Sequence, residues 1–62
     1  MITRVKIEGH KYFPQVKYNN EYVTIVDSGD GYFHLTPYNP NMYYVSSKML
    51  AEAICAGYLY YK

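Results

Sequence analysis

Apolar and polar residues alternate along the first part of the chain, a pattern typical of half-buried β-strands. Residues 2–8 place Val5 and Ile7 on one face and three charged side chains on the other. After Gly9, residues 10–18 predict a second strand that is interrupted at Pro14. Because proline has no N–H for a sheet ladder, it indicates an edge, a bulge or the first residue of the paired segment.

Two turn signals divide the next part of the chain into further strands. Asn19 and Asn20 favour a tight hairpin turn, since asparagine tolerates left-handed backbone conformations. Residues 22–26 are rich in β-branched side chains and predict a strand. Residues 27–31 (DSGDG) predict a turn in which the glycines supply positive φ. Residues 32–36 then return as the partner strand, with two apolar side chains on the same face.

A loop rich in proline and asparagine leads into a helix start. Residues 37–41 (PYNPN) predict this loop, and residues 42–45 predict a further short strand. Ser46 or Ser47 can cap a helix, because a serine oxygen accepts one of the unpaired N–H groups of the first turn. Residues 48–56 contain good helix formers and predict the helix itself.

The predicted helix has one apolar face and a clear stop signal. Leu50 and Ile54 stand at positions i and i+4, and Gly57 suits the position that ends a helix. Residues 58–61 (YLYY) then predict a last strand. Four longer strands, the helix and this strand give the order β-β-β-β-α-β in one domain that covers residues 1–62.

Residues 23–50 resemble the C-terminal half of a bacterial SH3-like domain. The shared features are an apolar strand, an acidic turn with glycines, an aromatic pair, and an aromatic-Val-Ser-Ser-Lys-x-Leu ending. The corresponding pieces are Val23-Thr24-Ile25-Val26, Asp27-Ser28-Gly29-Asp30-Gly31, Tyr32-Phe33-His34-Leu35, and Tyr44-Val45-Ser46-Ser47-Lys48-Met49-Leu50. The resemblance implies a mainly β fold, namely a small SH3-like barrel of about five strands with one short helix near the C-terminus.

This resemblance does not carry over the usual ligands of the family. SH3-like domains that bind proline-rich peptides have tryptophan at the first aromatic position, where this chain has Tyr32. The proline and tyrosine near the ending of the eukaryotic domains are replaced by Ser46 and Met49. The Asn-Val-Arg-x-Gly-Pro run of the wall-targeting branch is missing as well. Polyproline and cell-wall ligands are therefore not expected.

Composition and charge favour one small cytoplasmic domain. A chain of 62 residues suffices for one small domain, and its net charge of +1 comes from scattered charges. No apolar run approaches the roughly 18 residues of a membrane span, so no membrane association is expected. One cysteine, Cys55, cannot form an internal disulfide. This favours a reducing compartment, and the expected location is the cytoplasm.

No pattern in the sequence predicts catalysis, a cofactor or a metal. Residues 27–31 lack the alternating oxygen ligands of a calcium loop, so a structural hairpin turn is favoured. His10 and His34 are far apart in the sequence and are expected at the surface. Cys55 lies near the predicted helix C-terminus, which favours a partly buried structural thiol over a nucleophile. We therefore expect a protein that is not an enzyme.

Ten tyrosines in 62 residues are the unusual feature of the composition. They cannot all be buried, and exposed tyrosine is enriched in interface hot spots; cross-strand packing on an open sheet face is the alternative. The first hypothesis is a non-enzymatic module that docks on a protein partner, such as a phage or mobile-element accessory protein that inhibits or redirects a host factor. Its predicted contacts are Tyr32, His34, Tyr38 and Tyr44.

The second hypothesis is a small barrel that binds single-stranded nucleic acid. Bases stack on aromatic side chains, and clustered cations neutralise phosphates. If the first two strands pair, they bring together a modest basic stripe. Its residues are Arg4, Lys6, Lys11 and Lys17. The low net charge ranks this hypothesis second, and the sequence leaves self-association open.

Overall fold

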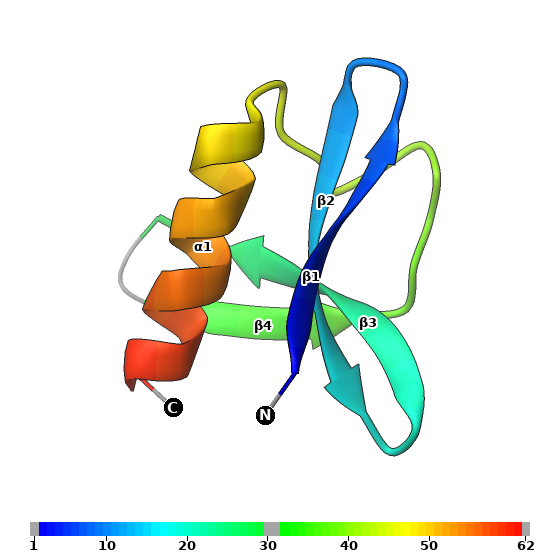
Figure 1. The fold of residues 1–62 in the computed structure, drawn as a ribbon. Coiled ribbons are helices and arrows are strands. Elements are labelled where there is room, and N and C mark those ends of the chain that lie inside the picture. The colour runs from blue at the N-terminus through cyan, green and yellow to red at the C-terminus, as the bar shows by residue number, and fades with distance from the viewer. Residues whose placement is uncertain (1, 30–31, 62) are drawn as a thin grey trace.

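The fold is a four-stranded antiparallel sheet followed by one helix (Figure 1). The computed structural model describes residues 2–29 and 32–61 of the chain. The strands are in sheet order β1-β2-β3-β4, and α1 packs across one face. The elements are β1 (Thr3–Glu8), β2 (Lys11–Tyr18), β3 (Glu21–Asp27), β4 (Phe33–Thr36) and α1 (Lys48–Tyr61).

Short turns join the first three strands, as the sequence predicts. Gly9 has a φ of 62° in the turn between β1 and β2. Asn19 and Asn20 have φ values of 51° and 66° in the turn between β2 and β3. Two consecutive left-handed residues match the right-handed twist of a hairpin, which explains the preference for asparagine here.

The predicted interruption of the second strand at Pro14 is wrong, because β2 runs through this residue and pairs Pro14 with Val5 of β1. The backbone N–H of Lys17 donates to the Ile2 carbonyl at 2.8 Å, so the backbone N–H and C=O groups of the odd-numbered residues of β2 point toward β1. The backbone nitrogen of Pro14 therefore points toward the opposite side, where β3 pairs. The β2–β3 ladder begins at Gln15, next to Pro14. Pro14 thus lies just outside the β2–β3 ladder, where its nitrogen need not donate a hydrogen bond.

Beyond that point β3 diverges from β2 and pairs with β4. Ile25 lies opposite Leu35 in this second ladder. In the turn that follows β3, Asp27 accepts a hydrogen bond from the N–H of Gly29, whose φ is 85°. The predicted positive φ at Gly31 lies outside the described residues.

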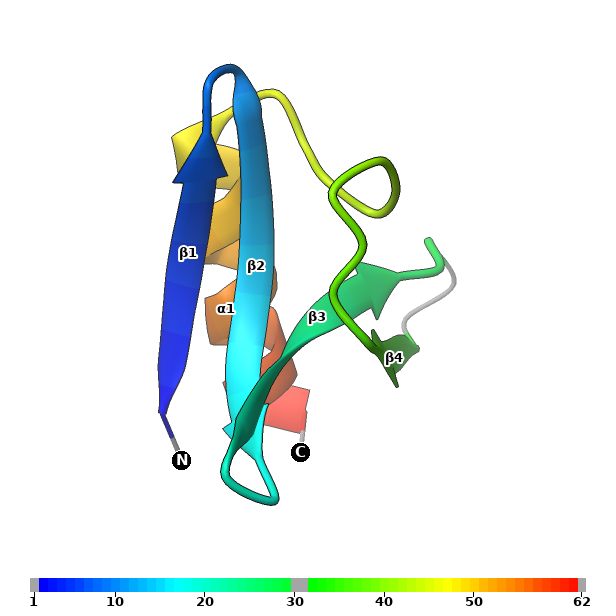
Figure 2. The ribbon, with the colours of Figure 1, turned by 90° about the vertical axis from the view of Figure 1, so that its right-hand side faces the viewer.

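The prediction of a strand at residues 42–45 is wrong. This part of the chain is a loop in which Tyr43 has a φ of 62°, a conformation that interrupts an extended backbone. Val45 alone forms a bridge to β2, exchanging backbone hydrogen bonds of 2.9 and 3.0 Å with Tyr12. Figure 2 shows this segment passing beside the upper part of β2 before it enters α1.

The predicted helix start is confirmed, whereas its predicted end is wrong. The Ser47 hydroxyl accepts a hydrogen bond from the Leu50 N–H at 3.3 Å, as an N-cap does. Gly57 does not stop the helix. A side-chain carbon at Gly57 would lie 3.1 Å from Cζ of Phe33, so glycine here allows β4 and α1 to approach closely. Residues 58–61, predicted as a strand, continue the helix.

The main core lies between α1 and the inner face of the sheet, which we define as the face that packs on the helix. Its centre is Val16 and Ile25 from the sheet and Ile54 and Cys55 from α1. Partly buried apolar side chains surround this centre. They are Val5, Val23, Phe33, Leu35, Val45 and Tyr58. Tyr58 thus extends the contact between α1 and the sheet into the last turn of the helix.

The fold is mainly β, but the expected barrel is not closed. In the described part of the chain the sheet is open, with β1 and β4 at its two edges. Figure 1 shows β4 running across the direction of β1 and β2, so the sheet is strongly twisted. The segment expected to supply the last strand, residues 58–61, is helical and cannot pair with the sheet.

Candidate functional site

A mainly apolar groove of about 290 Å³ opens between β3 and the start of α1. It lies where β3 has left β2, beyond the last pair of that ladder. Proline, branched aliphatic and tyrosine side chains form most of its wall. The lining residues are Pro14, Ile25, Val26, Asp27, Tyr43, Tyr44, Val45, Leu50 and Ile54.

The rim of this groove is exposed. Tyr44 retains 43% of its accessible surface and Leu50 retains 51%, and Tyr43 is similarly exposed. Leu50 shares a helix face with Ile54, as the sequence predicts, because both line the groove, and Leu50 lies at its exposed rim. The left-handed backbone of Tyr43, which turns the loop here, had no signal in the sequence.

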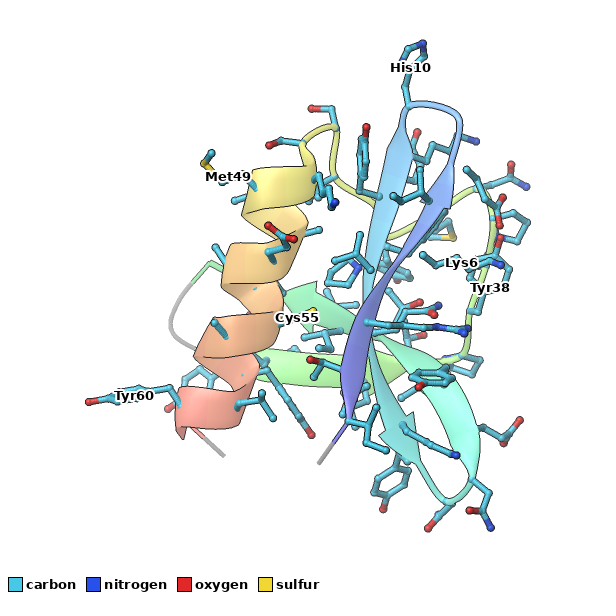
Figure 3. The ribbon with its side chains drawn as sticks, in the orientation of Figure 1. Lys6, His10, Tyr38, Met49, Cys55 and Tyr60 are labelled. Carbon is cyan, nitrogen blue, oxygen red and sulfur yellow. The ribbon has the colours of Figure 1, made fainter. Side chains whose placement is uncertain are left out.

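The outer face, which we define as the sheet face away from α1, carries a second cluster. Phe13 is fully buried there, because the rings of Tyr38 and Tyr44 pack edge-on against it with centroids 5.1 and 5.7 Å away. The loop that follows β4 thus covers the middle of β2. Figure 3 shows Tyr38 and Lys6 together on this side of the sheet, opposite α1.

The predicted protein contacts are only partly brought together. Tyr38 and Tyr44 share Phe13, and only Tyr44 lines the groove. His34 is exposed on β4, as predicted, and Tyr32 is exposed just before that strand. These two residues do not line the groove.

The four predicted basic residues all lie on the outer face. Arg4 and Lys6 alternate along β1, opposite Gln15 and Phe13 of β2. Lys11 and Lys17 occupy the same face of β2, because residues separated by an even number project to the same side. The antiparallel pairing of β1 and β2 is what brings these side chains together.

A polar network that the sequence did not suggest supports one end of this basic face. The Nε of Arg4 donates to Oε1 of Gln15 at 2.8 Å, and Nε2 of Gln15 donates to Oγ1 of Thr24 at 3.4 Å. Gln15 and Thr24 are both buried. The Arg4 guanidinium also lies over the Tyr22 ring, 3.7 Å from its centroid. The alternation of residues along the strands could have predicted that these side chains share one face. It could not have predicted the hydrogen bonds and the ring contact between them.

Tyr38 and Glu8 form the most strongly perturbed titrating pair. The Tyr38 hydroxyl donates a hydrogen bond to the Glu8 carboxylate, which also lies 3.5 Å from the Lys6 ammonium. The bond to Glu8 raises the pKa of Tyr38 from its ordinary 10.0 to about 12. The same bond, helped by Lys6, lowers the pKa of Glu8. The pair therefore favours a neutral phenol beside a charged carboxylate.

This pair predicts a loss of stability at high pH. Because the pKa of Tyr38 is higher in the folded protein than in the unfolded chain, its contribution is complete below pH 10 and is lost as pH rises toward about 12. We expect urea unfolding to show a steeper decline in this range for wild type than for Tyr38→Phe. Tyr18→Phe, a change at an exposed ring of β2, should keep the wild-type decline; equal slopes for wild type and Tyr38→Phe would contradict the pairing.

Cys55 faces β1 from the helix, and its predicted burial is confirmed. Its Sγ lies 3.6 Å from the Arg4 carbonyl oxygen, and Figure 3 shows it between α1 and β1. Burial raises the pKa of the Cys55 thiol. A thiol of this kind has little thiolate character and is a poor nucleophile.

Two further features of the described residues concern metal binding and membrane spans. Within residues 2–29 and 32–61, no group of three or more His, Cys, Asp or Glu side chains could hold a metal ion. In the same part of the chain, no helix has the length and apolar character that crossing a membrane requires.

Comparison with protein-family models, curated proteins and solved structures gives no match for this chain. The resemblance of residues 23–50 to bacterial SH3-like domains therefore stays a prediction.

Proposed function

We propose that the protein is a non-enzymatic binding module that docks on a protein partner through the groove between β3 and α1. The observation that carries this proposal is the exposed apolar rim, formed by Tyr43, Tyr44 and Leu50 around an apolar floor. Exposed contiguous apolar side chains are typical of interaction sites, and tyrosine is enriched among interface hot spots.

The size of the groove favours a protein segment over a small molecule. Its volume of about 290 Å³ lies at the lower limit of small-molecule pockets, which enclose roughly 300–1,000 Å³. A groove of this size suits one or two apolar side chains presented by another protein. Such a docking role is compatible with an accessory protein that inhibits or redirects a host factor.

The proposed interface differs from the predicted contact set. Tyr44 remains in it, and Tyr43 and Leu50 join it because they form the rim. Tyr32, His34 and Tyr38 stay predicted contacts outside the groove. The SH3-like resemblance adds no ligand, since the sheet is open and the peptide-binding tryptophan position holds Tyr32.

Leu50→Ala tests this proposal without disturbing the outer face. A partner captured from the native host would be purified, and its binding measured by calorimetry. We expect Leu50→Ala to weaken binding by about 1–3 kcal/mol, as truncation of an interface anchor does. Alanine preserves the helix, so circular dichroism should show an unchanged fold.

Leu59→Ala is the matched control. Leu59 lies on the same helix with 43% of its surface exposed, and it is outside the groove lining. This variant should bind the partner within about twofold of wild type, since only rim residues are proposed as anchors. Equal weakening by the two substitutions would contradict docking in the groove.

A further inference from the structure

The outer face of the sheet concentrates positive charge in a way that the net charge conceals. Four of the six basic side chains of the sequence project from β1 and β2 on this face. They are Arg4, Lys6, Lys11 and Lys17. Among the described residues of the four strands, Glu8 is the one acidic side chain on the same face. Four cations against one carboxylate give a basic surface on a nearly neutral protein.

Aromatic rings, and in one case also a carbonyl group, hold three of these cations in place. The Arg4 guanidinium lies 3.7 Å from the Tyr22 centroid. The Lys6 ammonium lies 5.3 Å from the Tyr38 centroid. The Lys11 ammonium lies 5.1 Å from the Tyr44 centroid and donates to the Pro40 carbonyl at 3.2 Å. Cations that are already ordered lose less side-chain entropy when an anionic ligand binds.

Glu8 offsets the positive charge at one end of the face, next to Lys6 and Lys11. Its carboxylate accepts the Tyr38 hydroxyl and pairs with Lys6, so it is directed into the cluster. Lys11 lies directly opposite Glu8 in the β1–β2 ladder, whereas Arg4 and Lys17 lie further along the strands and are exposed. A phosphate chain could therefore contact these cations along the face.

We propose that the outer face binds single-stranded nucleic acid, an activity separate from docking in the groove. The basic stripe spans two neighbouring strands, which lie about 4.8 Å apart in any sheet. Lys11 and Lys17 are six residues apart on β2, which corresponds to roughly 20 Å of extended chain. The loop that follows β4 covers Phe13 between these two lysines, so the stripe continues between them through Arg4 and Lys6 of the neighbouring β1. A narrow stripe of this kind suits one phosphate backbone.

The chemistry of the face favours a single strand over a duplex. Proteins that read duplex sequences insert a helix or a β-ribbon into the major groove. This face instead presents four cations that alternate along the strands of a larger sheet. Single strands offer unstacked bases, which stack on exposed aromatic rings. Tyr44 retains 43% of its surface next to Lys11 and can supply such a ring.

The test is fluorescence anisotropy with a labelled 12-nucleotide thymidine oligomer at two salt concentrations, about 50 and 300 mM. We expect binding in the micromolar range at low salt. If all four cations contact phosphates, the logarithm of affinity should fall with the logarithm of salt with a slope of about −2.8, which is roughly a 150-fold loss between the two conditions. Absence of saturable binding at the lower salt would overturn the proposal.

Single-charge variants locate the site. Lys17→Ala and Lys6→Ala should each reduce the salt slope by about 0.7 and weaken binding several-fold. Lys48→Ala makes the same charge change at the exposed start of α1. It should leave affinity within about twofold of wild type if local contacts with phosphates control binding. Equal effects of Lys48→Ala and Lys17→Ala would show non-specific attraction and overturn the site.

Two further probes distinguish the ligand class. A duplex of the same length and vesicles containing phosphatidylserine would be titrated under the same conditions. Tighter binding to either probe than to the single strand would overturn the assignment. Leu50→Ala should bind the oligomer as wild type does, so a failure of the groove proposal would leave this result unchanged.

Discussion

Replacing Phe13 by alanine is expected to destabilise the protein by about 3–5 kcal/mol, the usual cost of removing a buried phenylalanine. Phe13 is fully buried, although it lies on the sheet face away from the helix. Its burial comes from Tyr38 and Tyr44, whose rings pack edge-on against it. Removal of the ring therefore leaves a cavity and also removes the contact that holds the loop on the sheet.

A loss of this size is comparable with the whole stability of so small a domain. Below about 70–80 residues, one hydrophobic core rarely supplies more than roughly 3–5 kcal/mol. We expect Phe13→Ala to be largely unfolded at 37 °C, with a far-ultraviolet circular dichroism spectrum that lacks the wild-type signal. Urea titration at low temperature would give the difference in free energy of unfolding.

Tyr18→Ala is the control for this prediction. Tyr18 lies on the same strand and is exposed, so its removal creates no buried cavity. The expected cost is below about 1 kcal/mol, the range of intrinsic β-propensity. If Phe13→Ala melted as close to wild type as Tyr18→Ala does, the outer cluster would not contribute to the fold.

The parts of the fold that local chemistry determines could be predicted. Asn19 and Asn20 adopt the left-handed conformations that a two-residue hairpin requires. Ser47 caps the helix through a bond to an N–H three residues later. Each of these signals acts within a few residues of its own position.

The C-terminal turn of the helix could not be predicted in this way. Residues 58–61 have the β-propensity of aromatic side chains, but propensity yields to tertiary contacts. Tyr58 packs against the core, and its ring meets Phe33 edge-on with centroids 6.3 Å apart. Gly57 makes room for the same ring, so a residue that suggested a stop instead allows the helix to dock.

The basic outer face could be predicted from the sequence, whereas the groove could not. Once β1 and β2 pair, simple alternation puts Arg4, Lys6, Lys11 and Lys17 on one face. The sequence alone was sufficient to predict this basic face, provided that the first two strands pair. The groove depends on where β3 leaves β2 and on the left-handed backbone at Tyr43. Both features arise from contacts between distant segments, which no local pattern records.

Replacing Ile54 by alanine is the corresponding test of helix docking. Ile54 belongs to the main core with Val16 and Ile25, and deletion of such a side chain costs about 2–5 kcal/mol. Ile54 also lines the groove, so solvent can reach part of the space that it leaves. We therefore expect a cost of about 2–3 kcal/mol, below that of Phe13→Ala.

Met49→Ala separates loss of docking from loss of helix propensity. Met49 lies on the same helix with 78% of its surface exposed, and Figure 3 shows it directed away from the sheet. Methionine and alanine are both good helix formers, so this change should shift the free energy of unfolding by less than about 0.5 kcal/mol. A helix of 14 residues is marginal in water without tertiary contacts. If Ile54→Ala cost as little as Met49→Ala in urea titrations, packing against the sheet would not stabilise the helix. The buried wall of the groove, which Ile54 helps to form, would then be contradicted as well.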